Sequence, residues 1–186
     1  MQNLLRLHTF VICAYKESPY LEECVESLKN QEQQSNILMV TSTPNEYIEK
    51  ISRKYGIELK INTGQGGIVQ DWNFAYRQCK TPYITIAHQD DIYFKDYAAR
   101  AIKMLEQSKK PLIYFSDYCE IRNGQRVTSN RLLQVKRILL FPLRGRLFKG
   151  STFVRRRSLS LGSAICCPAV TYAANNLPDP VFTVRY

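Results

Sequence analysis

Residues 84–93 read Ile-Thr-Ile-Ala-His-Gln-Asp-Asp-Ile-Tyr and join a short apolar run to two adjacent carboxylates. The β-branched run Ile84-Thr85-Ile86 is typical of a strand in the middle of a sheet. In open α/β sheets, ligands bind in the crevice beyond the carboxyl ends of the strands. Asp90 and Asp91 are therefore predicted to lie at a ligand-binding edge, where a cation would relieve their mutual repulsion. The alternative is that both simply begin a solvated loop.

The segments before this stretch alternate between strand and helix patterns. Nearly continuous apolar runs predict strands over 8–13 and 37–40, and a third strand is predicted over 57–61. Between them, Leu21, Cys24, Val25 and Leu28 recur at the spacing of one helix face. This β-α-β-α-β order predicts an α/β fold with a mostly parallel, doubly wound sheet flanked by helices.

Local signals predict where the first two helices begin and end. Ser18 and Pro19 have the pattern of an N-cap followed by proline at the first helical position. Thr43-Pro44-Asn45-Glu46 has the spacing of a capping box, which makes Thr43 the second N-cap. Gly56 then has the pattern of a helix stop.

The chain beyond residue 61 gives weaker signals. The glycine-rich segment 62–67 precedes a helical pattern, so its amides are either available to a phosphate or part of a plain turn. Asn123-Gly124 predicts a hairpin that pairs 118–122 with 126–129, which would add a small antiparallel ribbon to the sheet. Residues 131–141 mix leucine with lysine and arginine at helical spacing and predict a basic amphipathic helix.

Composition indicates one globular domain over residues 1–186. The chain is 45% hydrophobic and 23% charged, which is ordinary for a protein with its own core. It contains no apolar run of about 18 residues and no signal-peptide pattern. Its six cysteines form no Cys-x-x-Cys pair, so a reducing, cytoplasmic compartment is expected.

The net charge of +10 is distributed unevenly. Residues 1–120 contain 14 basic and 15 acidic side chains, whereas residues 121–178 contain 11 basic and no acidic side chain. Such a block indicates an anionic partner, such as phosphate groups, nucleic acid or an acidic membrane face. The alternative is a flexible basic loop without a specific ligand.

Several segments resemble the family 2 glycosyltransferases of the GT-A fold. Residues 10–17 and 20–28 are similar to the family's opening strand, its Pro-x-Tyr-Asn-Glu-like loop and its Leu-Glu-Glu-Cys-Leu-x-Ser-Leu helix. Residues 71–93 are similar to the segment that leads into the DxD-type metal site. Residues 162–168 are similar to a later loop on the acceptor side. The resemblance covers most of residues 10–172.

The resemblance implies inverting transfer of a sugar from a nucleoside-diphosphate donor, usually UDP-linked, to an acceptor hydroxyl. Such a reaction would serve glycan or cell-envelope polysaccharide synthesis, and the acceptor would be a glycan or a lipid-linked molecule. Residues 1–120 would form the half that binds the nucleotide sugar, and residues 121–186 the basic, acceptor-side half. An anionic membrane at the inner face is a further possible partner, whereas nucleic acid is not expected.

The resemblance also implies a site. Mn²⁺ or Mg²⁺ would bind Asp90 first and Asp91 second. Because adjacent residues of an extended chain point in opposite directions, both ligate directly only if the chain turns between them. The nucleotide sugar would contact Cys13, Ala14, Tyr15, Glu17, Thr41, Ser42, Gly67, Asp71, Asn73 and Asp90.

Three departures from the family pattern concern this site. Thr41-Ser42 stand where the family has an Asp-Asp run that contacts the base. His88 stands where the DxD pattern has its first acid, and it is either a metal ligand or a residue that orients Asp90. The family's general base is a later carboxylate, but Asp179 is the only acid after Glu120. We therefore expect a chain truncated at its C-terminus, with Asp179 as the alternative base.

Two other classes of protein remain open at this point. A sugar-phosphate nucleotidyltransferase needs a glycine-rich loop after the first strand, and Cys13-Ala14-Tyr15-Lys16 contains no glycine. A basic module that binds nucleic acid or a membrane surface would account for the charge block. It would leave the first 120 residues unexplained.

Overall fold

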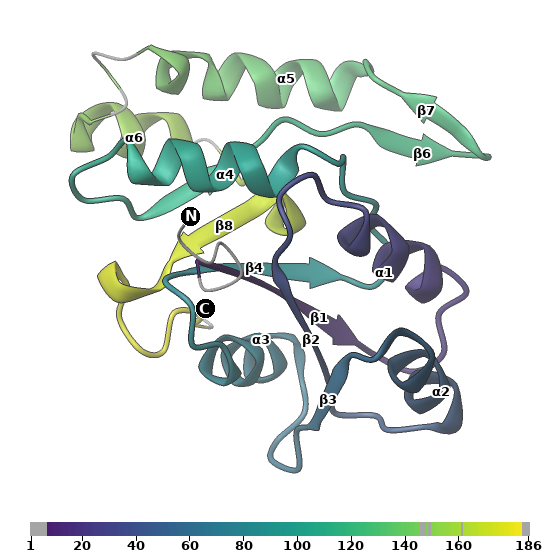
Figure 1. The fold of residues 1–186 in the computed structure, drawn as a ribbon. Coiled ribbons are helices and arrows are strands. Elements are labelled where there is room, and N and C mark those ends of the chain that lie inside the picture. Colours follow the sequence, from purple (N-terminus) through teal and green to yellow (C-terminus); the bar gives the residue numbers. More distant parts are fainter. Residues whose placement is uncertain (1–6, 146–147, 149, 161, 184–186) are drawn as a thin grey trace. The chain divides into compact units, whose positions relative to one another are not determined.

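The structure is a computed structural model that describes residues 7–145, 148, 150–160 and 162–183. The described residues form two compact units (Figure 1). The first unit comprises those of Met1–Tyr114 and Thr171–Tyr186, and the second comprises those of Phe115–Val170.

Four parallel strands form the centre of the first unit. Their order in the sheet is β3-β2-β1-β4, with bounds β1 His8–Ala14, β2 Asn36–Thr41, β3 Glu58–Ile61 and β4 Tyr83–His88. Cys13 of β1 pairs with Val40 of β2 on one side and with His88 of β4 on the other. The carboxyl ends of these three strands are therefore level, and the strand order reverses at β1. The predicted doubly wound sheet is confirmed.

The sheet continues beyond β4 with a strand from the end of the chain. β8 (Val170–Ala173) pairs antiparallel to β4, and β5 (Ile113–Phe115) follows it. The predicted antiparallel ribbon also exists, because β6 (Glu120–Arg122) pairs with β7 (Gln125–Val127). The ribbon is, however, a separate two-stranded sheet in the second unit. Asn123 (φ 50°) and Gly124 (φ 74°) form its predicted turn.

Helices cover both faces of the parallel strands (Figure 1). Alternate residues of β1 divide between two cores, with Phe10 and Ile12 in one and Val11 in the other. The first core also contains α1 (Leu21–Lys29), α2 (Glu46–Tyr55) and α4 (Tyr97–Glu106), and the second contains α3 (Ile68–Gln78). The predicted face of α1 is confirmed, because all four of its apolar residues are buried.

The predicted N-caps of the first two helices are wrong. α1 has Tyr20 as its N-cap rather than Ser18, and α2 has Asn45 rather than Thr43. Asn45 Oδ1 accepts a hydrogen bond from Ile48 N at 2.9 Å. Thr43 Oγ1 is used elsewhere, since it accepts from Lys16 N. The predicted stop at Gly56 is confirmed by its left-handed φ of 61°.

A chain of hydrogen bonds crosses the core of the first unit. His8 Nδ1 lies 2.8 Å from Ser35 Oγ, and His8 Nε2 lies 2.8 Å from Thr85 Oγ1. Thr85 Oγ1 lies 2.7 Å from Thr171 Oγ1, which lies 3.1 Å from the Tyr97 hydroxyl. Every buried polar side chain in this hydrogen-bond network therefore has a partner.

The second unit combines the β6–β7 ribbon with short helices. They are α5 (Arg131–Leu140), η2 (Phe141–Arg144), α6 (Thr152–Leu159) and η3 (Cys167–Ala169), while η4 (Ala174–Asn176) belongs to the first unit. α5 confirms the helix predicted over 131–141. Within the described residues, no helix has both the length and the apolar character that crossing a bilayer requires. All six cysteines are free thiols.

Candidate metal and nucleotide site

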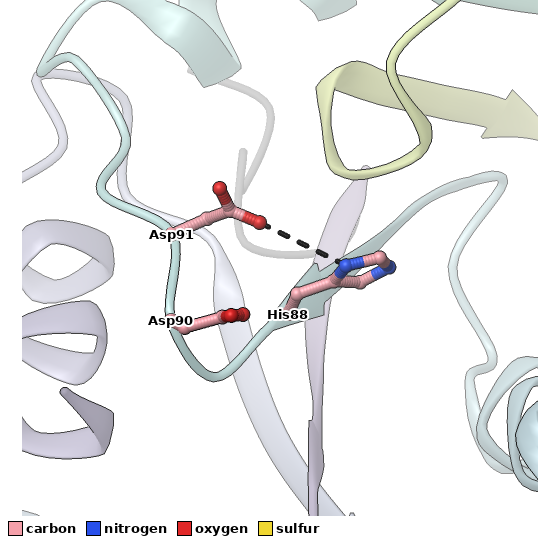
Figure 2. A group of neighbouring side chains, drawn as sticks. All are labelled: His88, Asp90 and Asp91. Carbon is pink, nitrogen blue, oxygen red and sulfur yellow. Dashed lines mark ion pairs between the residues drawn. The ribbon is translucent and has the colours of Figure 1, made fainter. Parts of the chain in front are cut away.

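The chain turns sharply where β4 ends. Asp91 N donates a hydrogen bond to His88 O at 3.3 Å, which closes a turn over residues 88–91. His88, Asp90 and Asp91 consequently offer one ligand atom each, and these atoms lie within 4.8 Å of one another. Figure 2 shows the three side chains projecting to the same side of the turn. The turn that direct ligation by both carboxylates requires is therefore present.

The electrostatics of this cluster favour a cation. Burial raises the pKa of Asp91 to about 6, and the negative charge of Asp90 adds to the effect. Burial lowers the pKa of His88, although Asp90 opposes the shift, so the imidazole is neutral and has a lone pair to donate. Among the described residues, no lysine or arginine forms an ion pair with either carboxylate; His88 Nδ1 lies 3.8 Å from Asp91 Oδ2. Two carboxylates and one imidazole suit a divalent cation such as Mn²⁺.

His88 is held in place from two sides. Its ring lies against the indole of Trp72, with centroids 5.3 Å apart and planes inclined by 31°. Its carbonyl oxygen accepts a hydrogen bond from Cys24 Sγ at 3.3 Å. Burial raises the pKa of the Cys24 thiol to about 12, so the thiol stays protonated and able to donate. Such outer contacts fix the orientation of a metal ligand.

The loop after β1 is fixed to the loops after both neighbouring strands. Gln89 Oε1 accepts from Tyr15 N, and Gln89 Nε2 donates to Tyr15 O, both at 2.9 Å. On the other side, Lys16 N donates to Thr43 Oγ1 at 2.7 Å. The Tyr15 side chain is 53% exposed and is available to a ligand. The role of Gln89 was missed from the sequence, where its only signal is its position beside the carboxylates.

Asp71 joins the ends of β2 and β3 to the first turn of α3. Its carboxylate accepts from Ser42 Oγ at 2.9 Å, from Asn62 Nδ2 at 2.7 Å and from Gly67 N at 3.4 Å. The structure therefore brings together three predicted site residues, Ser42, Gly67 and Asp71. Asn62 is a fourth member, and it was predicted only as part of the glycine-rich segment. Two amides of this segment are already used within the loop, since Gly67 N bonds to Asp71 and Gly64 N bonds to Asn62 Oδ1.

Gly67→Ala is expected to lower the free energy of unfolding by about 1–3 kcal/mol, because a side chain there is strained. Gly67 has φ of 137°, and an added Cβ would lie 2.6 Å from Gln70 Oε1. Urea denaturation measures the effect. Gly150→Ala is the matched control, since its added Cβ would meet nothing within 4 Å. Equal stability of the two variants would show that the loop relaxes without strain.

The other predicted nucleotide-sugar contacts lie in different surroundings. Ala14 and Thr41 are buried, at 3% and 2% exposure, while Glu17 is exposed. Burial, then the charges of Asp71 and Cys79, raise the pKa of the Cys13 thiol. The amide of Asn73 exchanges two hydrogen bonds with the backbone of Phe182.

Asp179 lies away from the carboxyl edge. Its carboxylate pairs with the guanidinium of Arg77, with Nη2 to Oδ1 at 2.9 Å and Nε to Oδ1 at 3.0 Å. Arg77 is in the last turn of α3, whereas Asp71 is in the first. The structure thus does not bring Asp179 together with Asp90 and Asp91.

Many solved structures are similar to this chain, including the following three. TarS 1–349 of S. aureus in complex with UDP-GlcNAc has 16% identity and a TM-score of 0.59, over 90% of this chain and 45% of that chain. Glucosyl-3-phosphoglycerate synthase from Mycobacterium tuberculosis, in complex with Mn²⁺, UDP and phosphoglyceric acid, has 14% identity and a TM-score of 0.60, over 91% and 56%. The mannosyltransferase PcManGT from Pyrobaculum calidifontis, in complex with GDP-Man and Mn²⁺, has 20% identity and a TM-score of 0.52, over 63% and 36%.

These similarities establish the fold. The chain spans about half the length of the first two proteins and 36% of the third. No curated protein matches the chain in a sequence comparison. The profile of the family described as "Glycosyl transferase family 2" matches residues 9–171, which is most of the sequence. The chain therefore belongs to glycosyl transferase family 2 and has its GT-A fold.

Proposed function

We propose that this chain binds a nucleoside-diphosphate sugar together with a divalent cation and takes part in transferring a hexosyl group to an acceptor hydroxyl. The observation that carries the proposal is the cluster of His88, Asp90 and Asp91 beyond the carboxyl end of β4. β4 is the neighbour of β1, where the strand order reverses, and open α/β sheets bind their ligands at such points.

The register of the sheet supports a donor laid across three strand ends. Adjacent strands lie about 4.8 Å apart, so the ends of β2 and β4 are separated by about 10 Å. That span lets the base lie near Ser42 and Asn62 while the diphosphate reaches Asp90. Tyr15 lies between them at the end of β1, where its exposed ring is available to the nucleoside. The bonds from Gln89 and Thr43 hold the Tyr15 loop before the ligand arrives, which lowers the entropy lost on binding.

The cation would be held by Asp90 and Asp91 with His88 as a third ligand. When bound, it would neutralise the charge that develops on the diphosphate leaving group. The imidazole in this set favours Mn²⁺ over Mg²⁺, because Mg²⁺ prefers oxygen ligands. Trp72 lies against the imidazole, and Cys24 bonds to the backbone carbonyl of His88, so both support the residue that would be the third ligand. We assign no catalytic role to Asp179, whose carboxylate is paired with Arg77.

The donor, the acceptor and the location are finer parts of this proposal. The UDP and UDP-GlcNAc complexes among the similar structures support a uridine nucleotide, and the GDP-Man complex makes guanosine the alternative. Residues 1–120 would bind the donor, and residues 121–186 would serve a glycan or lipid-linked acceptor in polysaccharide synthesis. The six free thiols support a cytoplasmic location.

Asp90→Asn is expected to weaken binding of UDP in the presence of Mn²⁺ at least tenfold, because the variant removes a charged metal ligand. A ligand that binds only the folded state raises the melting temperature, so a thermal-shift titration measures the loss. Asp179→Asn removes the same charge but is expected to leave the response unchanged. If neither UDP nor GDP with Mn²⁺ shifts the melting temperature of the wild-type chain, the proposed donor site is wrong.

A further inference from the structure

Helix α5 directs part of its apolar surface outward, although Leu133 is fully buried. Val135 and Ile138 are 48% and 71% exposed, and Phe141, which follows the helix, is 68% exposed. Two of its three charged residues face the other way, since Lys136 Nζ donates to the Tyr118 hydroxyl and Arg137 Nε donates to Asp117 Oδ2, both at 2.8 Å. In an ordinary surface helix the apolar stripe faces the core, so exposed apolar residues such as Val135 and Ile138 are unusual. An exposed apolar patch of this kind marks an interaction surface.

Arginines lie at both ends of this apolar stripe. Arg131, Val135 and Ile138 recur at i, i+4 and i+7, so Arg131 shares the outward face of the helix. Arg144 ends η2, three residues after Phe141. We call these five residues (Arg131, Val135, Ile138, Phe141 and Arg144) the α5–η2 face. No ion pair among the described residues involves either arginine.

The rest of the second unit has the same character. Residues 121–178 contain no acidic side chain, and the two acids earlier in the unit pair with its own arginines, Glu120 with Arg122 and Asp117 with Arg137. In α6, which packs against α5, Phe153 is 78% exposed, and Arg156 and Arg157 are exposed as well. The unit therefore presents apolar side chains within an unopposed positive field.

We propose that the α5–η2 face binds the surface of an anionic lipid bilayer. Apolar side chains flanked by arginines match the boundary between acyl chains and negatively charged headgroups. A second copy of this chain is a poorer match, because two such faces would bring like charges together. Nucleic acid would pair with the arginines but would leave Ile138 and Phe141 without an apolar partner. The inference goes beyond the proposed donor site and needs neither nucleotide nor metal.

Flotation of the protein with vesicles tests the proposal. The wild-type chain is expected to bind vesicles of phosphatidylcholine mixed with phosphatidylglycerol, to bind pure phosphatidylcholine much less, and to dissociate as salt is raised. The double variant Arg131→Ala/Arg144→Ala should lower the partition coefficient by about 25-fold, about fivefold for each arginine. Ile138→Ser/Phe141→Ser should lower it at least about tenfold.

Met104→Ser is the control, since Met104 is 43% exposed on α4 in the first unit, and its vesicle binding should equal that of the wild type. Circular dichroism and the response to UDP with Mn²⁺ report whether each variant is folded. Equal vesicle binding by the wild type and Ile138→Ser/Phe141→Ser would overturn the proposal. Absent binding of the wild type to the anionic vesicles would also overturn it, and a dimer that the same variant disrupts, or salt-sensitive binding to DNA, would then identify the other occupant. Loss of the nucleotide response alone would contradict only the donor site.

Discussion

His8→Gln is expected to remove a pH dependence of stability worth up to about 5 kcal/mol between pH 6.5 and pH 3. His8 is fully buried, and burial lowers its pKa from 6.5 to about 3. Between these values the unfolded chain binds a proton that the folded chain does not. The free energy of unfolding therefore falls as the pH falls, by about 1.4 kcal/mol per pH unit. Above pH 6.5 the ring is neutral in both states, so His8 no longer makes the free energy of unfolding depend on pH.

The surroundings of His8 explain why the ring stays neutral. Its two nitrogens meet the hydroxyl groups of Ser35 and Thr85, and neither partner carries a negative charge that would stabilise an imidazolium. The ring of Phe10 contacts the imidazole edge to face, with centroids 4.5 Å apart. A proton added to this ring would place an unpaired charge in the core, which is the costly case for a buried group.

Urea denaturation between pH 5 and pH 7.5 measures the effect. The stability of the wild type should fall faster with decreasing pH than that of His8→Gln, while carboxylates and His88 titrate in both proteins and cancel in the difference. Ser35→Ala is the control, because it removes one hydrogen bond and leaves the buried imidazole in place. Parallel curves for the wild type and His8→Gln would show that His8 titrates alike in the folded and unfolded chains.

The sequence predicted those parts of the fold that depend on local periodicity. The apolar face of α1, the strand β4 and the left-handed Gly56 can each be predicted from residues that are close together in the sequence. The position of β8 does not, because its partner Thr85 lies 86 residues before Thr171, and a four-residue apolar strand fits several places in a sheet. Strand order depends on long-range pairing, which a local sequence pattern does not reveal.

The errors and omissions in the site have the same origin. Thr43 was predicted to cap α2, but its hydroxyl instead bonds to Lys16, 27 residues away. Gln89 and Asn73 each exchange two hydrogen bonds with a distant backbone segment, at Tyr15 and Phe182. Asp90 and Asp91 could be predicted as candidates because two carboxylates at a strand end carry a signal by themselves. An amide side chain looks the same in sequence whether it braces a loop or faces solvent.

Asp71→Ala is expected to lower the free energy of unfolding by about 3 kcal/mol and to weaken UDP binding about tenfold, although Asp71 is not a predicted metal ligand. Hydrogen bonds to a charged group contribute about 1.5–3 kcal/mol each. Loss of the Asp71 carboxylate removes the acceptor that the donors on Ser42, Asn62 and Gly67 share. Those donors come from the ends of β2, β3 and the start of α3. Their separation would loosen the wall proposed to hold the base.

Urea denaturation and a thermal-shift titration with UDP and Mn²⁺ measure the two effects. Asp179→Asn is the matched control, because its carboxylate also bonds to α3 but lies at the surface, where an ion pair contributes at most about 1 kcal/mol. A double-mutant cycle with Ser42→Ala separates bracing from general destabilisation. The Asp71–Ser42 coupling should be about 1 kcal/mol or more, since the two side chains are in direct contact. If the effects of the two substitutions on the free energy of unfolding are additive, Asp71 supports the wall proposed to hold the base without Ser42. In that case the serine at the end of β2 would be free to meet the base directly.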